Sequence, residues 1–434
     1  MFASSLFTRL ARRTGLLLAF AGSMVPAGAH AQSASALSPY DLARARPGEP
    51  TWAPLMRLRA SAPRFDHDTA TQRQAWLQLL AQAEATFGNY DRALAAWDRL
   101  GTASIADIDA ARRRFTAARQ LSVLDTVLAM ADTAREIMIN ERHHAASDRL
   151  LTLQLLRTLR AKGFRYFAAE AFPADSALHA PGFPRNDDSY TSEPLFAEVV
   201  REARRLGYTL VAYEAAGSQW EQPDSLTPQQ RRDWAQAHNL AAATVERDPG
   251  AKVLVHAGFD HIRERATSAW HPMGAYFRAR TGIDPVTVDQ TSGSERSTPA
   301  FAHPVHRVFG SALPSTGTAF VDSAGAVIGA SAMLVDLVAI RAAAAPVAGR
   351  PAHLAMLGTR RAITVRTPPC RTRHCVLVAH RVGDPPEAAV LDRVEVERTT
   401  TATLMLPNGV ARLTLYDVGG ARLLQWTRRT DPAR

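Results

Sequence analysis

Short apolar runs alternate with amphipathic helical segments through the middle of the chain. The apolar runs predict five strands, at 136–140, 164–169, 208–213, 252–257 and 285–288. The segments between them repeat their apolar residues at helical spacing, which predicts helices at about 147–162, 194–206, 228–246 and 264–280. Strands separated by helices of this length are typical of α/β proteins, so we expect a mainly parallel sheet flanked by helices on both faces.

The two ends of the chain show different patterns. From Gln72 to Gln120 the apolar spacing is helical with a break at Gly88, which predicts a helical hairpin packed on the main domain. Near the C-terminus, short alternating runs predict a small antiparallel β unit, with strands at 362–366, 375–380, 390–397, 401–406 and 411–416. Residues 300–350 are ambiguous, although the apolar runs at 319–321 and 334–340 would fit as extensions of the main sheet.

The first residues have the layout of a secretory signal peptide. A basic start with Arg9, Arg12 and Arg13 precedes a short apolar run, and Ala29-His30-Ala31 offers a small-x-small cleavage site. We therefore expect an exported, periplasmic protein with no transmembrane segment once this peptide is removed. The whole chain then divides into a signal peptide (1–31), a loose leader segment (32–70), the helical hairpin (71–130), an α/β catalytic-type domain (131–350) and the C-terminal β unit (351–434).

Composition and charge narrow the class of partner. The 434 residues are 46% apolar, which is ordinary for a globular protein and excludes collagen, coiled coil and wholesale disorder. The net charge of +10 comes from 51 basic and 41 acidic residues, and the arginines are scattered among the acids. Nucleic-acid binders concentrate basic residues on one face or tail, so we expect no nucleic-acid partner. The sequence leaves the oligomeric state open.

The two cysteines stand close together in the chain. Cys370 and Cys375 are separated by four residues, a spacing that lacks the CxxC pairs and further ligands of a zinc site. An exported protein meets an oxidising compartment. We therefore predict a disulfide across a tight turn.

Polar residues follow each predicted strand of the α/β region. Strand 136–140 leads into Glu141, Arg142, His143 and His144, and the other strands are followed by Glu170, Glu214, the segment Gly258-Phe-Asp-His261, and Asp289. Ligands of open α/β sheets bind beyond the carboxyl ends of the strands. We therefore expect Glu141, the His143–His144 pair, Glu170 and His261 to share one site, and Arg149, at the start of the next helix, to lie near it.

Two kinds of chemistry fit such a set. Histidine and carboxylate together suit Zn²⁺, Mn²⁺ or Fe²⁺, for which the candidate ligands are Glu141, His143, Glu170 and His261. The same residues suit metal-free general acid–base hydrolysis, in which Arg149 would stabilise negative charge in the transition state. His256 lies within an apolar strand and is interpreted as structural, and for Glu214 and Asp289 a capping role is as favoured as a functional one.

These residues resemble the signature of a known superfamily. It groups the erythromycin esterase-like enzymes, the Tiki-type metalloproteases with their TraB relatives, and the haem-binding, iron-regulated lipoproteins. Its members have a GExxH or GxxH element after the first strand, a helix arginine, a strand ending in Glu and a late GxxH. The corresponding segments of this chain are Asn140-Glu-Arg-His-His144, Arg149, Phe164-Arg-Tyr-Phe-Ala-Ala-Glu170 and Gly258-Phe-Asp-His261.

The resemblance covers about 135–290 and implies an α/β fold with Glu141, one of His143 and His144, Glu170 and His261 lining the site. Asn140 departs from the pattern, because it replaces the glycine of the first element. The leading hypothesis is a hydrolase that cleaves an ester or amide of a small-molecule or peptide substrate, either without a cofactor or with a divalent metal. The alternative is a haem- or iron-binding protein without catalysis, whose candidate ligands are His144, Tyr190 and Tyr213. A third hypothesis is a module without catalytic activity that binds a partner protein.

Overall fold

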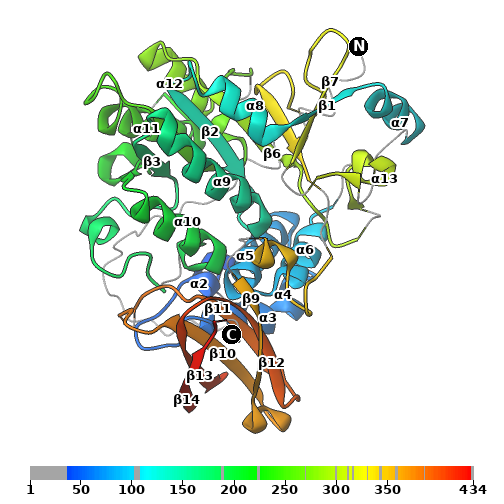
Figure 1. Cartoon of the computed structure of the whole chain (residues 1–434), viewed down its shortest axis with the longest axis vertical. Helices are drawn as coiled ribbons and strands as arrows, with labels where there is room; N and C mark the ends of the chain where they lie inside the picture. The colour runs from blue at the N-terminus through cyan, green and yellow to red at the C-terminus, as the bar shows by residue number, and fades with distance from the viewer. Residues whose placement is uncertain are drawn as a thin grey trace.

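The computed structural model shows an α/β domain, a set of N-terminal helices and a C-terminal β unit (Figure 1). The described residues are 37–101, 108–186, 190–221, 225–268, 270–298, 301–309, 312–314, 317–329, 331–341, 345–356, 360–385 and 387–431. The predicted signal peptide, 1–31, lies outside them. Among the described residues, no helix combines the length and the hydropathy that crossing a bilayer requires.

The main sheet has eight strands in the order β1-β7-β8-β6-β2-β5-β3-β4. The strands are β1 (Arg119–Ser122), β2 (Glu136–Glu141), β3 (Tyr166–Ala169), β4 (Thr209–Ala212), β5 (Val253–Gly258), β6 (Val286–Gly293), β7 (Thr318–Val321) and β8 (Leu337–Ile340). The pairs among β2 to β6 and the pair β6–β8 are parallel, whereas β7 pairs antiparallel with β8 and β1. The predicted α/β class with a mainly parallel sheet is thus confirmed, and the ambiguous runs of 300–350 extend this sheet.

Helices cover both faces of the sheet because its strands bury both sets of alternating side chains. Ile137 and Ile139 of β2 pack on one side and Met138 on the other, each in a separate apolar core. The helices of the first core are α8 (Val123–Met130), α9 (Arg149–Leu159) and α10 (Pro194–Arg205). Those of the second are α7 (Ile108–Thr116), α11 (Pro228–Ala243), α12 (Met273–Thr281) and α13 (Pro304–Phe309). The helix predicted at 264–280 starts late, because the short helix η7 (Phe259–Ile262) and a loop precede α12.

The N-terminal region corrects two of the expected boundaries. The segment expected to be loose, 32–70, contains three short helices among its described residues, α2 (Pro39–Ala43), α3 (Ala53–Ala60) and α4 (Ala62–Phe65). Each begins with a proline in its first turn and is too short to show a period. The predicted hairpin is α5 (Ala70–Phe87) and α6 (Tyr90–Asp98), and residues 108–130 belong to the main domain instead.

The C-terminal β unit is built from two small antiparallel sheets that share one apolar core. Their strands are β9 (Arg360–Arg366), β10 (His374–Arg381), β11 (Asp392–Glu397), β12 (Thr401–Pro407), β13 (Val410–Asp417) and β14 (Arg422–Arg429), with a short helix α14 (Ala352–Ala355) before them. Leu377 of β10 faces the β9–β12 pair, whereas its neighbours Val376 and Val378 face the helices α2–α6. The N-terminal helices therefore lie between the β unit and the main domain (Figure 1).

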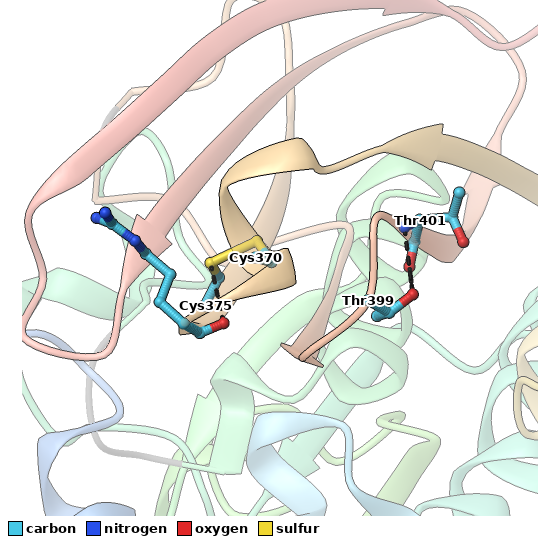
Figure 2. Close-up of a disulfide and its surroundings, with 5 residues drawn as sticks. Cys370, Cys375, Thr399 and Thr401 are labelled. Carbon is cyan, nitrogen blue, oxygen red and sulfur yellow. Dashed lines mark hydrogen bonds between the residues drawn. A yellow bond between two sulfur atoms is a disulfide. The ribbon is translucent and has the colours of Figure 1, made fainter.

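The predicted disulfide between Cys370 and Cys375 is present. It joins the short helix η10 (Pro368–Arg371) to the start of β10, close to the turn that carries Thr399 and Thr401 (Figure 2). Both cysteines are fully buried in the core of the β unit. The bond therefore fixes the entry of the chain into the central strand of that unit.

Removing this disulfide is expected to lower the free energy of unfolding by about 2 kcal/mol, because it closes a short loop with a sequence separation of 5. The measurement is urea unfolding of the Cys370→Ala/Cys375→Ala protein beside the oxidised wild type. Wild type unfolded in reductant is the control and should resemble the variant. Equal stability of all three samples would contradict the prediction.

Candidate active site

The predicted site residues come from neighbouring strand ends at the carboxyl edge of the main sheet. Glu141 is the last residue of β2 and lies opposite Gly258, the last residue of β5. Glu170 directly follows β3, and its backbone N–H donates to the carbonyl of His256 in β5. His261 lies three residues beyond Gly258 in η7. Because β2, β5 and β3 are adjacent and parallel, these side chains are brought to one place.

Arg149 forms a bidentate ion pair with Glu141. Nε of Arg149 donates to Oε2 of Glu141 at 2.6 Å and Nη2 donates to Oε1 at 2.9 Å. Nη1 donates to Glu193 at 2.6 Å, and Nη2 also reaches the carbonyl of His143. Arg149 is completely buried, with its N–H groups directed to these partners. These contacts make Arg149 a positioning residue for Glu141, and its expected role in stabilising negative charge in the transition state stays a prediction.

Glu193 links Arg149 to the N-terminal helices through buried hydrogen bonds. Its carboxylate caps α10 by accepting hydrogen bonds from the N–H groups of Leu195 and Phe196. It also accepts a hydrogen bond from the hydroxyl of Tyr90 in α6. Burial alone would raise the pKa of Glu193, but Arg149 and these hydrogen bonds lower it. The helical hairpin is thus connected to Glu141 through Glu193 and Arg149.

Glu141 orients His143. Nδ1 of His143 lies 3.0 Å from Oε1 of Glu141, and its ring stacks on Tyr190 with 4.5 Å between centroids. Burial alone would raise the pKa of Glu141, but Arg149 and His256 lower it well below its usual value. A carboxylate at this position assigns the proton of a neutral His143 to Nδ1, which leaves Nε2 as a proton acceptor. Nε2 makes no hydrogen bond to any other residue that the structure describes.

Gly258 provides the space beside Nε2 of His143. A Cβ at this position would lie 2.5 Å from Cε1 and 2.7 Å from Nε2 of His143, and 3.0 Å from Oε2 of Glu170. The imidazole edge and the Glu170 carboxylate therefore converge on the backbone of Gly258, whose N–H donates to Oε2 of Glu170 at 2.5 Å. This is a close approach that only glycine permits.

Glu170 is held as a carboxylate by Arg232 of α11. Nη2 of Arg232 donates to Oε1 of Glu170 at 2.5 Å, and the same guanidinium group pairs with Glu214, which follows β4. Burial alone would raise the pKa of Glu170, but Arg232, His261 and His143 lower it. Glu214 therefore takes part in the site network by balancing the charge of Arg232.

His261 forms a second histidine–carboxylate pair. Its Nδ1 lies 2.5 Å from Oδ1 of Asp233, and its Nε2 lies 3.0 Å from Nη1 of Arg232. Asp233 is held in turn by Trp270 and by the backbone N–H of Met273. Burial alone would lower the pKa of His261, but Asp233 raises it. The short contact with an arginine donor assigns the resting proton of His261 to Nδ1.

His256, which the sequence favours as structural, packs against Glu141, Thr152 and Phe196. Its Nδ1 lies 2.9 Å from the hydroxyl of Thr152, and its Nε2 is 3.0 Å from Oε2 of Glu141 in a geometry short of a hydrogen bond. The ring also packs edge-on against Phe196. These contacts support its interpretation as a buried residue that helps to place Glu141.

Asn140 has a specific structural role. Its side-chain amide donates to the carbonyl of Phe259 at 2.6 Å and to Asp289 at 2.8 Å, and its Oδ1 accepts from the N–H of Gln290. It thus ties the end of β2 to β6 and to η7. Asp289 also accepts from Ser292 and from other nearby hydroxyls, so it acts here as a structural residue.

His144, unlike His143, makes no hydrogen bond to Glu141. It stacks on Trp97 of α6 with 4.0 Å between ring centroids, and neither of its ring nitrogens has a hydrogen-bond partner among the described residues. The other candidate haem ligands have different partners from His144. Tyr190 stacks on His143, and the hydroxyl of Tyr213 donates a hydrogen bond to the carbonyl of His256 at 2.9 Å. Of the His143–His144 pair, His143 is therefore the residue at the site.

The predicted metal ligands do not fit a divalent ion. Arg149 occupies both oxygens of Glu141, and the oxygens of Glu170 are taken by Arg232 and the N–H of Gly258. A metal ion here would have to displace, or lie beside, two buried guanidinium groups. Among the described residues, the close set of potential ligands is instead His374, Glu395 and Glu397 on the β unit. There Glu395 already pairs with Arg59 and Arg92.

Comparisons with known proteins leave the family open. No family model matches the sequence, and no curated protein matches it. Solved structures that share part of the arrangement include a MARTX toxin effector domain, RRSP, from Vibrio vulnificus (16% identity, TM-score 0.28, covering 54% of this chain and 49% of that chain). Another reports a thiol-protease-like catalytic triad in the C-terminal region of Pasteurella multocida toxin (10% identity, TM-score 0.30, covering 79% of this chain and 52% of that chain). A third is described as bacterial protein toxins, at 15% identity and TM-score 0.29. The match spans about half the length of each solved chain, and at these TM-scores it assigns neither fold nor activity.

Sequence reasoning missed Arg232, Asp233, Glu193 and the α6 residues Tyr90 and Trp97. For Asp233 a signal exists in the pattern. Asp233 and Gln236 lie at helical spacing from Ala237 and Leu240, on the face of α11 that is buried. Polar side chains on the apolar face of a helix indicate buried partners. The α6 residues carry no such signal, because their contacts come from segments more than 40 residues away.

Proposed function

We propose that this chain is a hydrolase that cleaves an ester or amide by general acid–base catalysis, without a metal ion. The observation that carries the proposal is the His143 ring, held at Nδ1 by Glu141 while Nε2 is directed to Gly258 and Glu170. The geometry is that of a base oriented by a carboxylate, and Arg149 locks that carboxylate in place. The resemblance to the erythromycin esterase-like and Tiki-type superfamily supports the same reaction class.

The reaction uses one water molecule. Nε2 of His143 takes a proton from the water while the Glu170 carboxylate accepts a hydrogen bond from its second proton, and the water oxygen attacks the carbonyl carbon. The protonated His143, stabilised by Glu141, then donates its proton to the leaving oxygen or nitrogen, and the C–O or C–N bond breaks. Arg232 supplies positive charge on the side of Glu170, which favours the negatively charged tetrahedral intermediate.

The test is hydrolysis of a panel of p-nitrophenyl esters and p-nitroanilides by the purified protein. We expect hydrolysis of at least one member well above the buffer rate. A Glu141→Gln protein that folds but orients His143 poorly should be slower on the same substrate. A panel that the wild type leaves untouched, together with peptide substrates that it leaves intact, would contradict the proposal.

A Gly258→Ala substitution is expected to lower the rate by about tenfold or more. The new Cβ would stand in the space between His143 and Glu170, and shifting a positioned base by even 1 Å costs up to about 100-fold in rate. Gly250→Ala is the matched control, because a Cβ there meets a single side-chain oxygen, Oδ1 of Asp248, at 3.4 Å. The measurement is kcat/KM on the best ester, and equal rates for the two variants would count against the assigned geometry.

We also propose that the protein is exported to the periplasm. The signal-peptide layout of 1–31 is the basis of this proposal. The Cys370–Cys375 disulfide supports it, because such bonds persist in oxidising compartments. Cell fractionation with mass spectrometry of the mature N-terminus tests it. A cytoplasmic protein that retains residues 1–31 would overturn it.

A further inference from the structure

A group of unpartnered cationic and imidazole nitrogens lies directly beside the candidate active site. The guanidinium group of Arg142 makes no hydrogen bond to another described residue, and its Nη1 is buried. Nη2 of Arg296 is also buried without a partner, although its Nε is held by Asp98. Both ring nitrogens of His144 lack partners as well, and this side chain is only 2% exposed. Buried donors without acceptors cost free energy unless a ligand supplies the acceptor.

The carboxylates near Arg142 do not supply the missing hydrogen-bond acceptor. The acids whose charges act on Arg142 are Asp148, Asp260 and Asp289. Each of them already has other partners. Asp148 pairs with Arg341, Asp260 pairs with Arg263, and Asp289 accepts from the hydroxyls of Ser292 and Ser331. The backbone N–H of Arg142, not its guanidinium group, is what donates to Asp148. The positive charge of Arg142 is therefore not neutralised by a direct ion pair.

The two arginines also act on each other and on His144. Burial, together with the charge of Arg296, lowers the pKa of Arg142 to about 10. Burial and the same two arginines lower the pKa of His144. A neutral imidazole offers one donor and one acceptor, so it can hydrogen-bond a bound oxygen without adding to the repulsion. An anion placed among the three would remove that repulsion.

Aromatic rings connect this group to the catalytic histidine. Trp97 is half-buried, stacks on His144, and lies 5.8 Å from the guanidinium carbon of Arg142. Phe259 lies 5.7 Å from Trp97 and 5.2 Å from His143, between centroids. Its backbone φ of 47° is rare for a residue with a side chain. Such backbone strain persists where the surroundings impose it, and here it holds the Phe259 ring between the two sites.

We propose that Arg142, Arg296 and His144 bind an anionic oxygen group of the substrate, a carboxylate or a phosphate, and that Trp97 and Phe259 contact its apolar part. That the anion is part of a substrate rests on the proposed hydrolase function. The binding of the anion itself does not depend on that function. The substrate is then an acidic ester or amide whose charged group lies on the α6 side of His143. Planar guanidinium groups suit both kinds of oxygen anion.

The first experiment measures anion binding by the full chain, independently of catalysis. Tryptophan fluorescence is followed during titration with sodium phosphate, and separately with sodium acetate, against sodium chloride at equal ionic strength. We expect a saturable response to one or both anions that chloride does not produce. Affinity should fall at least about tenfold in Arg142→Gln and in Arg296→Gln, as expected for the loss of a charged hydrogen bond. A response to phosphate alone identifies a phosphate site, and a response to acetate alone identifies a carboxylate site.

The control is Arg428→Gln, an exposed arginine of β14 on the β unit, which should bind like wild type. Circular dichroism and the melting temperature establish that each variant is folded, and Arg296 lies on a different segment from Arg142 in case one substitution unfolds the chain. No saturable response in the wild type would overturn the proposal. An equal response in wild type and both arginine variants would do the same.

The second experiment compares two p-nitrophenyl esters with the same leaving group, the neutral butyrate and the acidic glutarate monoester. The ratio of kcat/KM for the acidic over the neutral ester should fall about tenfold or more in Arg142→Gln, with the Arg428→Gln ratio unchanged. If the wild type binds anions as expected but hydrolyses neither ester, the anion site stands and the proposed hydrolase fails. If both esters are hydrolysed at a ratio that the arginine variants leave unchanged, the hydrolase stands and the anion site fails.

Discussion

His143→Ala is expected to hydrolyse the best ester about 10²- to 10⁴-fold more slowly than the wild type, the usual cost of losing a positioned general base. The substitution removes the only group we assign to proton transfer, while Glu141 keeps its ion pair with Arg149. Because Glu170 and Arg232 stay in place, binding of substrate should change less than turnover. The loss should therefore fall mainly on kcat.

The matched control for this variant is His179→Ala, which removes an exposed histidine from the same domain. Its rate should equal that of the wild type. Both variants are checked for folding by their melting temperatures before rates are compared. A His143→Ala protein that is folded and as fast as His179→Ala would remove His143 from the mechanism.

Arg149→Met is expected to lower the free energy of unfolding by about 3–5 kcal/mol, the range measured when one partner of a buried ion pair is removed. Arg149 is fully buried between Glu141 and Glu193. Methionine has a similar length but leaves two buried carboxylates without their cation. These would have to take up protons or let water into the core.

Arg157→Met provides the comparison on the same helix, α9. Arg157 also pairs with a glutamate, Glu202, at 2.8 Å, but its side chain is 41% exposed. Removing such a surface pair costs at most about 1 kcal/mol. Urea unfolding of both variants beside the wild type gives the two differences. Equal and small losses for Arg149→Met and Arg157→Met would mean that the Glu141–Arg149–Glu193 chain does not stabilise the fold.

The parts of the fold that the sequence predicts are those with a strong local pattern. The five strands from 136 to 288 are buried on both faces and read as continuous apolar runs, so their positions agree with β2 to β6 within a few residues, except that β6 continues to Gly293. The last strand, β14, was missed because it is an edge strand with mostly exposed side chains, and no alternation marks it. The three short helices between 39 and 65 were missed because none is long enough to show a period.

In the site, too, the residues placed by local sequence patterns could be predicted, and those placed by contacts with distant segments could not. Glu141, His143, Glu170 and His261 could be predicted because parallel strands bring their carboxyl ends together. The role of Arg149 could not, since it also depends on Glu193, 44 residues further along the chain, which accepts from Nη1 of Arg149. The choice between His143 and His144 also depends on a distant residue, Trp97, which stacks on His144. Contacts of this kind leave no trace in hydrophobic periodicity.

In the proposed reaction, Glu141 and His143 activate water without a metal ion. The most direct measurement is the ester-hydrolysis rate of wild type and His143→Ala after exhaustive dialysis against EDTA, with metal content determined by plasma mass spectrometry on the same samples. We expect metal-free wild type to keep its full rate and His143→Ala to fall about 10²-fold or more below it. A wild-type rate that disappears on dialysis and returns with stoichiometric Zn²⁺, Mn²⁺ or Fe²⁺ would contradict the proposed reaction.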